Sequence, residues 1–281
     1  MPWAASVRRD LPWRRTRNPW WVLVSEVMLQ QTQVSRVVPK WEVFIERFPT
    51  ASACAEAPQA DVVRLWEGLG YHQRAVMLHR CAQAIRDRHD GVVPPGIGAL
   101  LALPGVGSYT ARAIRVFAYE TDDAVLDTNV GRILARAVAG SPCTGREAQA
   151  IADSLVPVRE GWTWNQGMLD LGALVCTKQR PRCAECCIRS VCEWRRRDPD
   201  GAHDPATGSA GVSTAQSKFN GSDRQGRGRM LAELRGHRDA VSVIALGEAT
   251  GWSDKARIAR ALSSLVMDQL AVVDAGMVRL R

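Results

Sequence analysis

The sequence predicts an all-α domain followed by a small α+β unit. Apolar residues recur at intervals of three and four from about residue 19 to residue 197, as they do along one face of a helix. No segment of this stretch alternates apolar and polar residues as a half-buried strand does. Short breaks that contain Pro or Gly separate the helices at 48–50, 93–96 and 103–105. We therefore expect helices alone in this part of the chain.

Two further segments follow the helical domain. Residues 198–222 are rich in Gly, Ala, Ser, Asp and Thr, a composition that buries little surface and is typical of a linker. The pattern then predicts helices over about 223–235 and 253–269 and two short strands around a turn at 274–276. Helices followed by a small hairpin resemble a winged helix, and a generic α+β cap is an equally good interpretation. The predicted domains are residues 1–197, 198–222 and 223–281.

Composition and charge narrow the class of protein. No stretch approaches the roughly 18 uninterrupted apolar residues of a membrane-spanning helix, and the first residues contain no apolar segment of signal-peptide length. We therefore expect a cytoplasmic protein. The net charge is +8, and all but four of the 37 basic residues are arginine, whose planar fork binds phosphate bidentately. This favours a nucleic acid as partner, although a codon bias toward Arg would give the same ratio.

Four of the eight cysteines lie close together, in the pattern Cys176-x6-Cys183-x2-Cys186-x5-Cys192. Cytosolic thiols at such spacings are metal ligands more often than disulfides. Zinc and a [4Fe–4S] cluster both take four thiolates, so the ligand type leaves both open. The remaining cysteines divide into predicted core residues, Cys54, Cys81 and Cys143, and Cys187, which has no assigned role.

A short turn at residues 103–107, Leu-Pro-Gly-Val-Gly, joins one apolar helix to the next. Gly105 and Gly107 allow the backbone to turn sharply and to approach another molecule closely. The first amides of the following helix then point outward at the positive end of its dipole, which suits a phosphate. The turn is therefore a candidate phosphate-binding hairpin, and an ordinary helix–helix connection has the same composition.

Two carboxylates stand out from their surroundings. Asp127 follows an apolar stretch and precedes a helix, and from its position alone capping of that helix is the favoured interpretation. Glu26 lies among apolar positions of a predicted helix. It is either a satisfied core residue or a carboxyl with a raised pKa that transfers a proton, and the pattern favours neither.

These segments, in this order, resemble the MutY adenine DNA glycosylases, a branch of the helix-hairpin-helix DNA glycosylases with an iron–sulfur cluster loop. The resemblance covers roughly residues 3–195 and implies the helix-hairpin-helix glycosylase fold, with two helical subdomains and a [4Fe–4S] cluster on the four cysteines. It rests on the motifs at 9–14 (RDLPWR), 25–32 (SEVMLQQT), 66–71 (WEGLGY), 103–111, 126–130 (LDTNV) and 165–173 (NQGMLDLGA) and on the cysteine pattern.

The resemblance implies base excision repair: the enzyme flips adenine mispaired with 8-oxoguanine or guanine out of duplex DNA and hydrolyses its glycosidic bond. Glu26 then protonates the adenine at N7, and Asp127 stabilises the oxocarbenium-like sugar, while Tyr109 and Asn129 orient these carboxylates and the substrate. The implied substrate-binding residues are Leu11, Trp13, Val34 and Gln166 in the adenine pocket, Gln31 and Tyr71 in the opened stack, and Arg9, Thr32 and Leu69. The implied phosphate-binding residues are Gly105, Val106, Gly107 and Tyr109 of the hairpin and Lys178, Arg180 and Arg182 of the cysteine loop.

Residue 109 separates two branches of the resembling enzymes. The endonuclease III-like lyases carry a Schiff-base lysine at this hairpin position, where this chain has Tyr109. No lysine occurs between Lys40 and Lys178, so we expect a monofunctional enzyme that leaves the strand intact. The alternatives are a thymine glycosylase for T:G mismatches and a non-catalytic DNA-binding protein.

The chain also departs from the resembling family. Its C-terminal segment does not look like the Nudix-like domain that recognises 8-oxoguanine in many of these enzymes, which leaves its selectivity for that base open. His72 stands where Tyr is frequent, and we expect an exposed loop substitution there. Cys187 stands where Pro is frequent. We expect a monomer associated with the bacterial nucleoid.

Overall fold

The structure is a computed structural model that describes residues 2–209 and 218–281. It divides into two compact units. Unit 1 comprises Met1–Val22, Pro95–Gly98 and Gly107–Ala215, and unit 2 comprises Leu23–Pro94, Ala99–Val106 and Gln216–Arg281. Within the described ranges, no helix is both long enough and apolar enough to cross a membrane.

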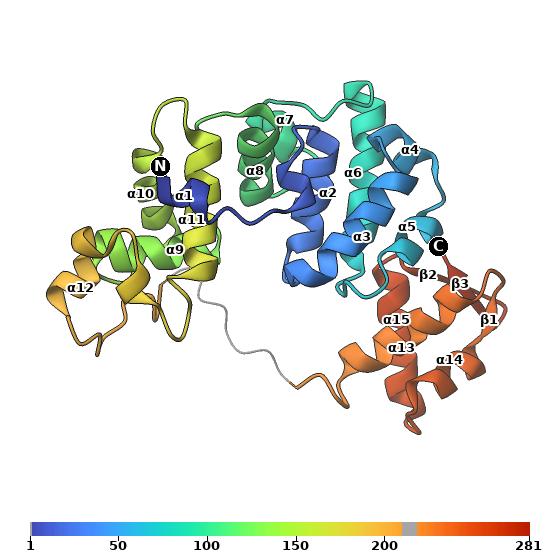
Figure 1. The fold of residues 1–281 in the computed structure, drawn as a ribbon. Helices are drawn as coiled ribbons and strands as arrows, with labels where there is room; N and C mark the ends of the chain where they lie inside the picture. Colours follow the sequence, from blue (N-terminus) through green and yellow to red (C-terminus); the bar gives the residue numbers. More distant parts are fainter. Residues whose placement is uncertain (1, 210–217) are drawn as a thin grey trace. The chain divides into compact units, whose positions relative to one another are not determined.

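All the regular elements in the described residues of unit 1 are helices. Its elements are α1 (Pro2–Ser6), η1 (Pro12–Arg14), α8 (Ser108–Tyr119), α9 (Thr128–Leu134), a π-helical turn η2 (Ala135–Ala139), α10 (Gly145–Leu155), α11 (Gly161–Leu174), η3 (Cys183–Glu185), η4 (Arg189–Val191) and α12 (Glu193–Arg197). Helix α11 packs against α1, α8 and α9, and η2 packs against α12 (Figure 1). Small residues allow the close approach: a Cβ on Gly172 of α11 would lie 2.5 Å from the Cβ of Asn129 in α9.

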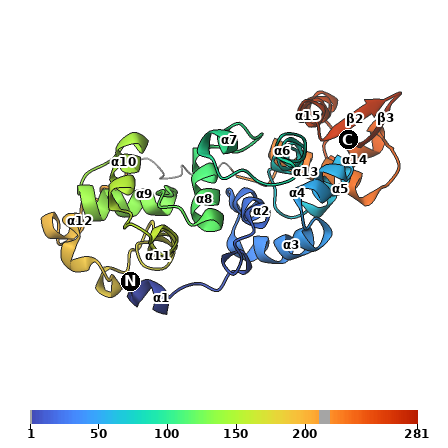
Figure 2. The same ribbon diagram turned by 90° about the horizontal axis from the view of Figure 1, so that it is seen from above.

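Helices form most of unit 2 as well. They are α3 (Val34–Arg47), α4 (Ala51–Glu56), α5 (Gln59–Leu65), α6 (Gln73–His89), α13 (Asp223–Gly236), α14 (Val243–Thr250) and α15 (Lys255–Met267), and α2 (Pro19–Leu29) and α7 (Ile97–Leu101) continue into it from unit 1. Helix α6 packs against α4 and α5, and Figure 2 shows α4 beside α6. Cys54 and Cys81 are buried in these helices, as predicted, and burial raises the pKa of each thiol to about 12.

The C-terminal part of unit 2 contains a small antiparallel sheet. Its strands β1 (Val241–Ser242), β2 (Ala271–Asp274) and β3 (Met277–Leu280) lie in the order β1-β3-β2, with Val273 opposite Val278. The succession α13, β1, α14, α15, β2, β3 contains the two predicted helices and the predicted two-stranded hairpin. Strand β1 and helix α14 were not predicted, because two residues are too few for an alternating pattern and the apolar residues 243–246 have no helical period.

Residues 198–209 are more closely packed than their composition predicts. The carboxylate of Asp204 accepts from Arg136, with 2.8 Å between Nε and Oδ1, and Arg136 is buried. Ser209 is also buried, and its hydroxyl accepts from the amide of Cys143 at 3.0 Å. A buried guanidinium and a buried amide both need a partner, so these two contacts hold the first half of the predicted linker on unit 1.

The expectation of an exposed residue at position 72 is wrong. His72 is partly buried, and its Nε2 lies 2.8 Å from Nη1 of Arg235 in α13. Burial and the neighbouring positive charges, Arg235 first among them, lower the pKa of His72 to about 4. A neutral imidazole can accept a hydrogen bond from arginine, so the residue that departs from the family pattern contacts the C-terminal part of unit 2.

Candidate active site

Glu26 lies on α2 in unit 2, in an apolar environment. Asn18 begins the helix: its side-chain oxygen accepts from the amides of Trp20 and Trp21 at 3.0 and 3.3 Å. Glu26 is 6% exposed, and its neighbours Val24 and Val27 are buried too. A buried carboxyl is costly unless it is satisfied or does chemistry, so its burial alone leaves both predicted roles open.

Asp127 caps α9 in unit 1, which confirms the prediction from its position. Its Oδ1 accepts from the amides of Asn129 and Val130 at 2.8 and 2.7 Å, and its Oδ2 accepts from Nδ2 of Asn129 at 2.7 Å. Burial raises the pKa of Asp127, against the opposing effect of these hydrogen bonds and of the Arg132 charge. The carboxylate is therefore held by three donors in a fixed orientation.

Asn129 also connects Asp127 to the cysteine loop. Its Oδ1 accepts from Nη2 of Arg132 at 2.9 Å, and Nε of Arg132 donates to the carbonyl oxygen of Cys176 at 2.7 Å. The orienting role predicted for Asn129 has a structural basis in these bonds. Sequence reasoning missed Arg132, a buried basic residue between Gly131 and Ile133 of α9.

The N-terminal segment is tied to α11 by a buried ion-pair network. Asp170 is 1% exposed and accepts from Arg14 at 2.8 and 2.9 Å and from Nε of Arg9 at 2.6 Å. Burial alone would raise the pKa of Asp170, but the hydrogen bonds and charges of Arg14 and Arg9 outweigh it and lower that pKa. Arg9, predicted to bind substrate, thus holds the segment that carries Leu11. Asp170 and Arg14 were missed, although a charged residue between apolar ones is the same signal that singled out Glu26.

Gln166 projects from the same helix, α11, and is buried. It is 5% exposed, and its Oε1 has no hydrogen-bond partner among the residues that the structure describes. Trp13, another predicted pocket residue of unit 1, is 7% exposed. A buried acceptor without a donor is costly in the free protein, so it is a candidate for a ligand's donor group.

Several predicted substrate-binding residues of unit 2 lie on two loops that contact each other. The hydroxyl of Thr32 donates to the carbonyl oxygen of Leu69 at 3.1 Å. Gln31 lies on the first of these loops, beside Thr32, and Tyr71 lies on the second, after Leu69. Their φ angles are 54° and 46°, and both residues are exposed. Val34 begins α3 directly after the first loop.

The hairpin has the geometry that its glycines predict. Gly105 has a φ of 76°, and a Cβ there would lie 3.0 Å from the Cβ of Met77, so a side chain at this position is strained. The amide of Val106 donates to the carbonyl of Leu103 at 3.2 Å, and Gly107 precedes the first residue of α8. Tyr109 lies in the first turn of α8 and packs partly on its apolar cluster.

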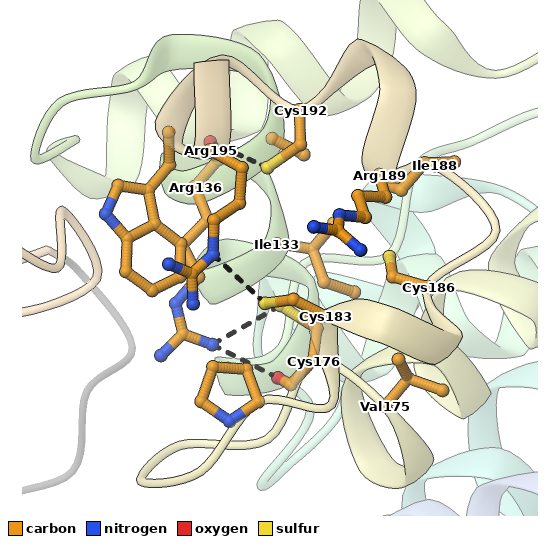
Figure 3. Close-up of a pocket in the computed structure, with 13 residues that line it drawn as sticks. Ile133, Arg136, Val175, Cys176, Cys183, Cys186, Ile188, Arg189, Cys192 and Arg195 are labelled. Atoms are coloured by element: carbon orange, nitrogen blue, oxygen red, sulfur yellow. Dashed lines mark hydrogen bonds between the residues drawn. The ribbon is translucent and has the colours of Figure 1, made fainter. Parts of the chain in front are cut away.

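The four cysteines of the loop line one cavity of unit 1 (Figure 3). Its empty volume is about 390 Å³, part of it open to solvent. Two arginines donate to sulfurs of these cysteines: Nη1 of Arg136 lies 3.3 Å from Sγ of Cys176, and Nε of Arg195 lies 3.2 Å from Sγ of Cys183. In the described part of the chain, no three His, Cys, Asp or Glu side chains form a group that could hold a single metal ion. Cys187 is exposed and lies outside the cavity lining.

The predicted phosphate-binding residues of the cysteine loop, Lys178, Arg180 and Arg182, are exposed. Arg182 is engaged within its own loop, because Nε donates to the carbonyl oxygen of Leu174 at 3.0 Å and Nη1 lies 3.3 Å from Glu185.

The predicted site residues are divided between the units. Unit 1 contains Arg9, Leu11, Trp13, Gly107, Tyr109, Asp127, Asn129, Gln166 and the cysteine loop, and unit 2 contains Glu26, Gln31, Thr32, Val34, Leu69, Tyr71, Gly105 and Val106. Glu26 is therefore a residue of unit 2, and Asp127 is a residue of unit 1.

Comparisons of the sequence with known proteins identify the family of the chain. A family model described as "HhH-GPD superfamily base excision DNA repair protein" matches residues 24–157. The chain is 44% identical over 274 residues to the adenine DNA glycosylase of Mycolicibacterium smegmatis, which covers 96% of this chain and 90% of that protein. The chain belongs to the adenine DNA glycosylase family. The human adenine DNA glycosylase is 39% identical over 212 residues, 70% of this chain and 39% of the human protein.

Solved structures show the same fold as this adenine DNA glycosylase family member. A thermostable thymine-DNA glycosylase has a TM-score of 0.65 and 27% sequence identity, and the match covers 70% of this chain and 93% of that one. An endonuclease III bound covalently to DNA has a TM-score of 0.60, with coverage of 70% and 92%; at 22% identity, this likeness shows the fold alone. The predicted family and helix-hairpin-helix glycosylase fold are confirmed.

Proposed function

We propose that this chain is a monofunctional adenine DNA glycosylase, which releases adenine mispaired with 8-oxoguanine or guanine from duplex DNA during base excision repair. The observation that carries the proposal is the buried Oε1 of Gln166, an acceptor without a partner in the described residues. The exocyclic amino group of a flipped adenine is a donor that would satisfy it. Family membership supports adenine, and the likeness to a thymine-DNA glycosylase makes thymine the second candidate.

The proposed reaction assigns opposite tasks to the two carboxyl groups. Glu26 donates its proton to N7 of the flipped adenine, so that the C1′–N9 bond breaks with its electron pair on a neutral base. The sugar becomes an oxocarbenium-like cation, and the ionised Asp127 stabilises that charge. Water adds to C1′ and loses a proton, which leaves an abasic site in an intact strand.

The three donors on Asp127 support its part in this reaction. They hold the carboxylate in one orientation before the charge on the sugar develops, so little reorganisation is needed when the bond breaks. Tyr109 at the hairpin supports the hydrolytic route, because a phenol forms no Schiff base and no lysine lies between Lys40 and Lys178.

We also propose that Cys176, Cys183, Cys186 and Cys192 hold a [4Fe–4S] cluster. The support is chemical and spatial: four thiol ligands line a single cavity, and arginines donate to two of their sulfurs. When bound, the cluster would cross-link the loop that carries Lys178 and Arg180. Four iron and four sulfide per chain, with the visible absorption of such a cluster, would support this assignment, whereas one zinc per chain would overturn it.

The proposed partner is duplex DNA that contains the mispair. The hairpin residues Gly105, Val106, Gly107 and Tyr109 and the exposed side chains of Lys178, Arg180 and Arg182 would contact its phosphates. We propose a monomer that acts in the cytoplasm on the nucleoid, and light scattering during gel filtration tests the oligomeric state.

An excision assay tests the function directly. Duplexes with A:8-oxoguanine, A:G and T:G pairs are incubated with excess protein and then divided. One half is treated with hot alkali, which breaks the strand at abasic sites, and the other half is loaded untreated. We expect cleavage of the adenine-containing strands only after alkali. Cutting of T:G alone would favour the thymine candidate, and strand breaks without alkali would contradict the monofunctional route.

A further inference from the structure

Arg74 lies in the first turn of α6, and its guanidinium binds six oxygens of unit 2. Nη1 donates to the carbonyls of Val27, Met28 and Gln30 at 2.7, 3.0 and 2.7 Å. The last carbonyls of a helix have no partner within it, so Arg74 satisfies the end of α2 and the residue that follows.

The second half of the guanidinium binds a different part of the chain. Nη2 donates to Oγ1 of Thr32 at 3.0 Å and to the carbonyls of Leu69 and Gly70 at 3.1 Å each. One planar side chain thus fixes residues 27–32 relative to residues 69–70. We call residues 27–32 and residues 69–71 the wedge loops.

Each wedge loop presents one exposed side chain from a strained backbone. Gln31 has a φ of 54° and Tyr71 a φ of 46°, a region that residues with a side chain rarely adopt. Tyr71 is 44% exposed, and the guanidinium carbon of Arg74 lies 5.5 Å from the centre of its ring. Strained residues of this kind persist only where the surrounding structure holds them in place. The six hydrogen bonds of Arg74 hold both loops, three in the segment of Gln31 and three divided between Thr32 and the residues before Tyr71.

Arg74 does more than cap α2. A cap would need only the carbonyls of Val27 and Met28, whereas half of the observed bonds go to Thr32 and to the loop before Tyr71. The Nε of Arg74 is buried and has no hydrogen-bond partner in the described residues. The hydrogen bonds of the guanidinium to the wedge loops therefore all come from its two outer nitrogens, Nη1 and Nη2. A lysine has one nitrogen with three donors and could not replace this fork.

We propose that Arg74 is a positioning residue, which sets the distance between Gln31 and Tyr71 so that together they fill the stack that the flipped adenine leaves. This inference rests on the proposed function and on the place in the opened stack that the family resemblance implies for those two side chains. Arg74 itself touches no substrate. Its loss would let the two loops move independently, and a displacement of about 1 Å can slow a reaction on the order of a hundredfold.

The test is a double-mutant cycle of Arg74→Lys and Tyr71→Ala. Four proteins are compared in single-turnover adenine release, in DNA affinity, in melting temperature and in the fluorescence of 2-aminopurine placed beside the target adenine, which reports unstacking. We expect Arg74→Lys to slow release about tenfold or more and to reduce the fluorescence change, with affinity altered less than about threefold. In the Tyr71→Ala protein, Arg74→Lys should add less than about twofold, because the group that it positions is already gone.

Two matched variants control for general destabilisation. Arg86→Lys changes a partly exposed arginine on the same helix, which pairs with Asp87, and should leave release unchanged. Ile85→Val removes one buried methyl group from α6 and lowers the melting temperature without touching the wedge loops. If Arg74→Lys fails to fold, Thr32→Val removes one oxygen from the clamp and should show the same non-additivity with Tyr71→Ala.

The outcomes separate the two levels of argument. A wild-type protein that releases no adenine overturns the proposed function and this inference with it. If the wild-type protein is active, three results would overturn the inference alone. Tyr71→Ala could release adenine as fast as the wild type, or the rate effects of Arg74→Lys and Tyr71→Ala could multiply in the double variant. Ile85→Val could also reproduce the loss of the fluorescence change.

Discussion

Asp127→Asn separates the capping role of this residue from its proposed electrostatic role. Asparagine caps a helix as well as aspartate does, so its Oδ1 can still accept from the amides of Asn129 and Val130. Its amide nitrogen would face Nδ2 of Asn129, where the carboxylate now accepts a bond, and this conflict should lower the free energy of unfolding by about 1 kcal/mol. The charge, however, is lost completely.

The rate should therefore fall much further than the stability. Loss of one preorganised electrostatic contact commonly costs about 3–4 kcal/mol in the transition state, which is two to three orders of magnitude in rate. Single-turnover release from an A:8-oxoguanine duplex measures this loss, and fluorescence anisotropy should show nearly unchanged affinity.

Asp127→Ala is the matched control, because it removes both the cap and the charge. It should be less stable than the Asn variant by about 1 kcal/mol and at least as slow. The electrostatic argument is refuted if the Asn variant releases adenine at close to the wild-type rate while only the Ala variant is slow, since the role of Asp127 would then be capping alone.

Three further predictions concern buried ionisable groups. Glu26→Gln should abolish adenine release while DNA binding survives, and undiminished single-turnover excision would contradict its role as proton donor. Asp170→Asn leaves Arg14 buried without its counter-charge and should lower the free energy of unfolding by about 3–5 kcal/mol, measured by urea denaturation; a loss below about 1 kcal/mol would show that Arg9 and Arg14 do not depend on that charge. The pKa of His72 is lowered to about 4 in the folded protein, so the unfolded state takes up the proton first as the pH falls below about 6.5. The free energy of unfolding should therefore decrease between pH 6.5 and pH 4, by at most about 3 kcal/mol. His72→Phe should remove that part of the pH dependence, and an identical profile for the two proteins would refute this origin.

Local signals in the sequence predicted the parts of the site that are local in the chain. The cap at Asp127, the left-handed Gly105 and the grouping of the four cysteines all depend on neighbours within a few residues. The packing of Asp204, by contrast, depends on Arg136, 68 residues back in the chain, and no local pattern indicates it.

Pairings between distant residues could not be predicted. Asp170 lies 156 residues from Arg14 in the chain, so nothing near either residue indicates its partner. The same holds for Arg74, which an isolated helix pattern would place on a solvated face, and for His72, whose contact with Arg235 spans 163 residues. In each case only the folded chain shows which group the charged or polar residue contacts.

The contacts of Asp204 and Ser209 with unit 1 indicate a position in the chain, after Ser209, at which one C-terminal unit could be exchanged for another. A fragment that stops at residue 197 would leave the Arg136 guanidinium buried against the cysteine loop with no carboxylate, whereas a fragment that stops just after Ser209 keeps both contacts. A chimera that joins a different C-terminal unit to this helical core should therefore keep residues 198–209 with the core.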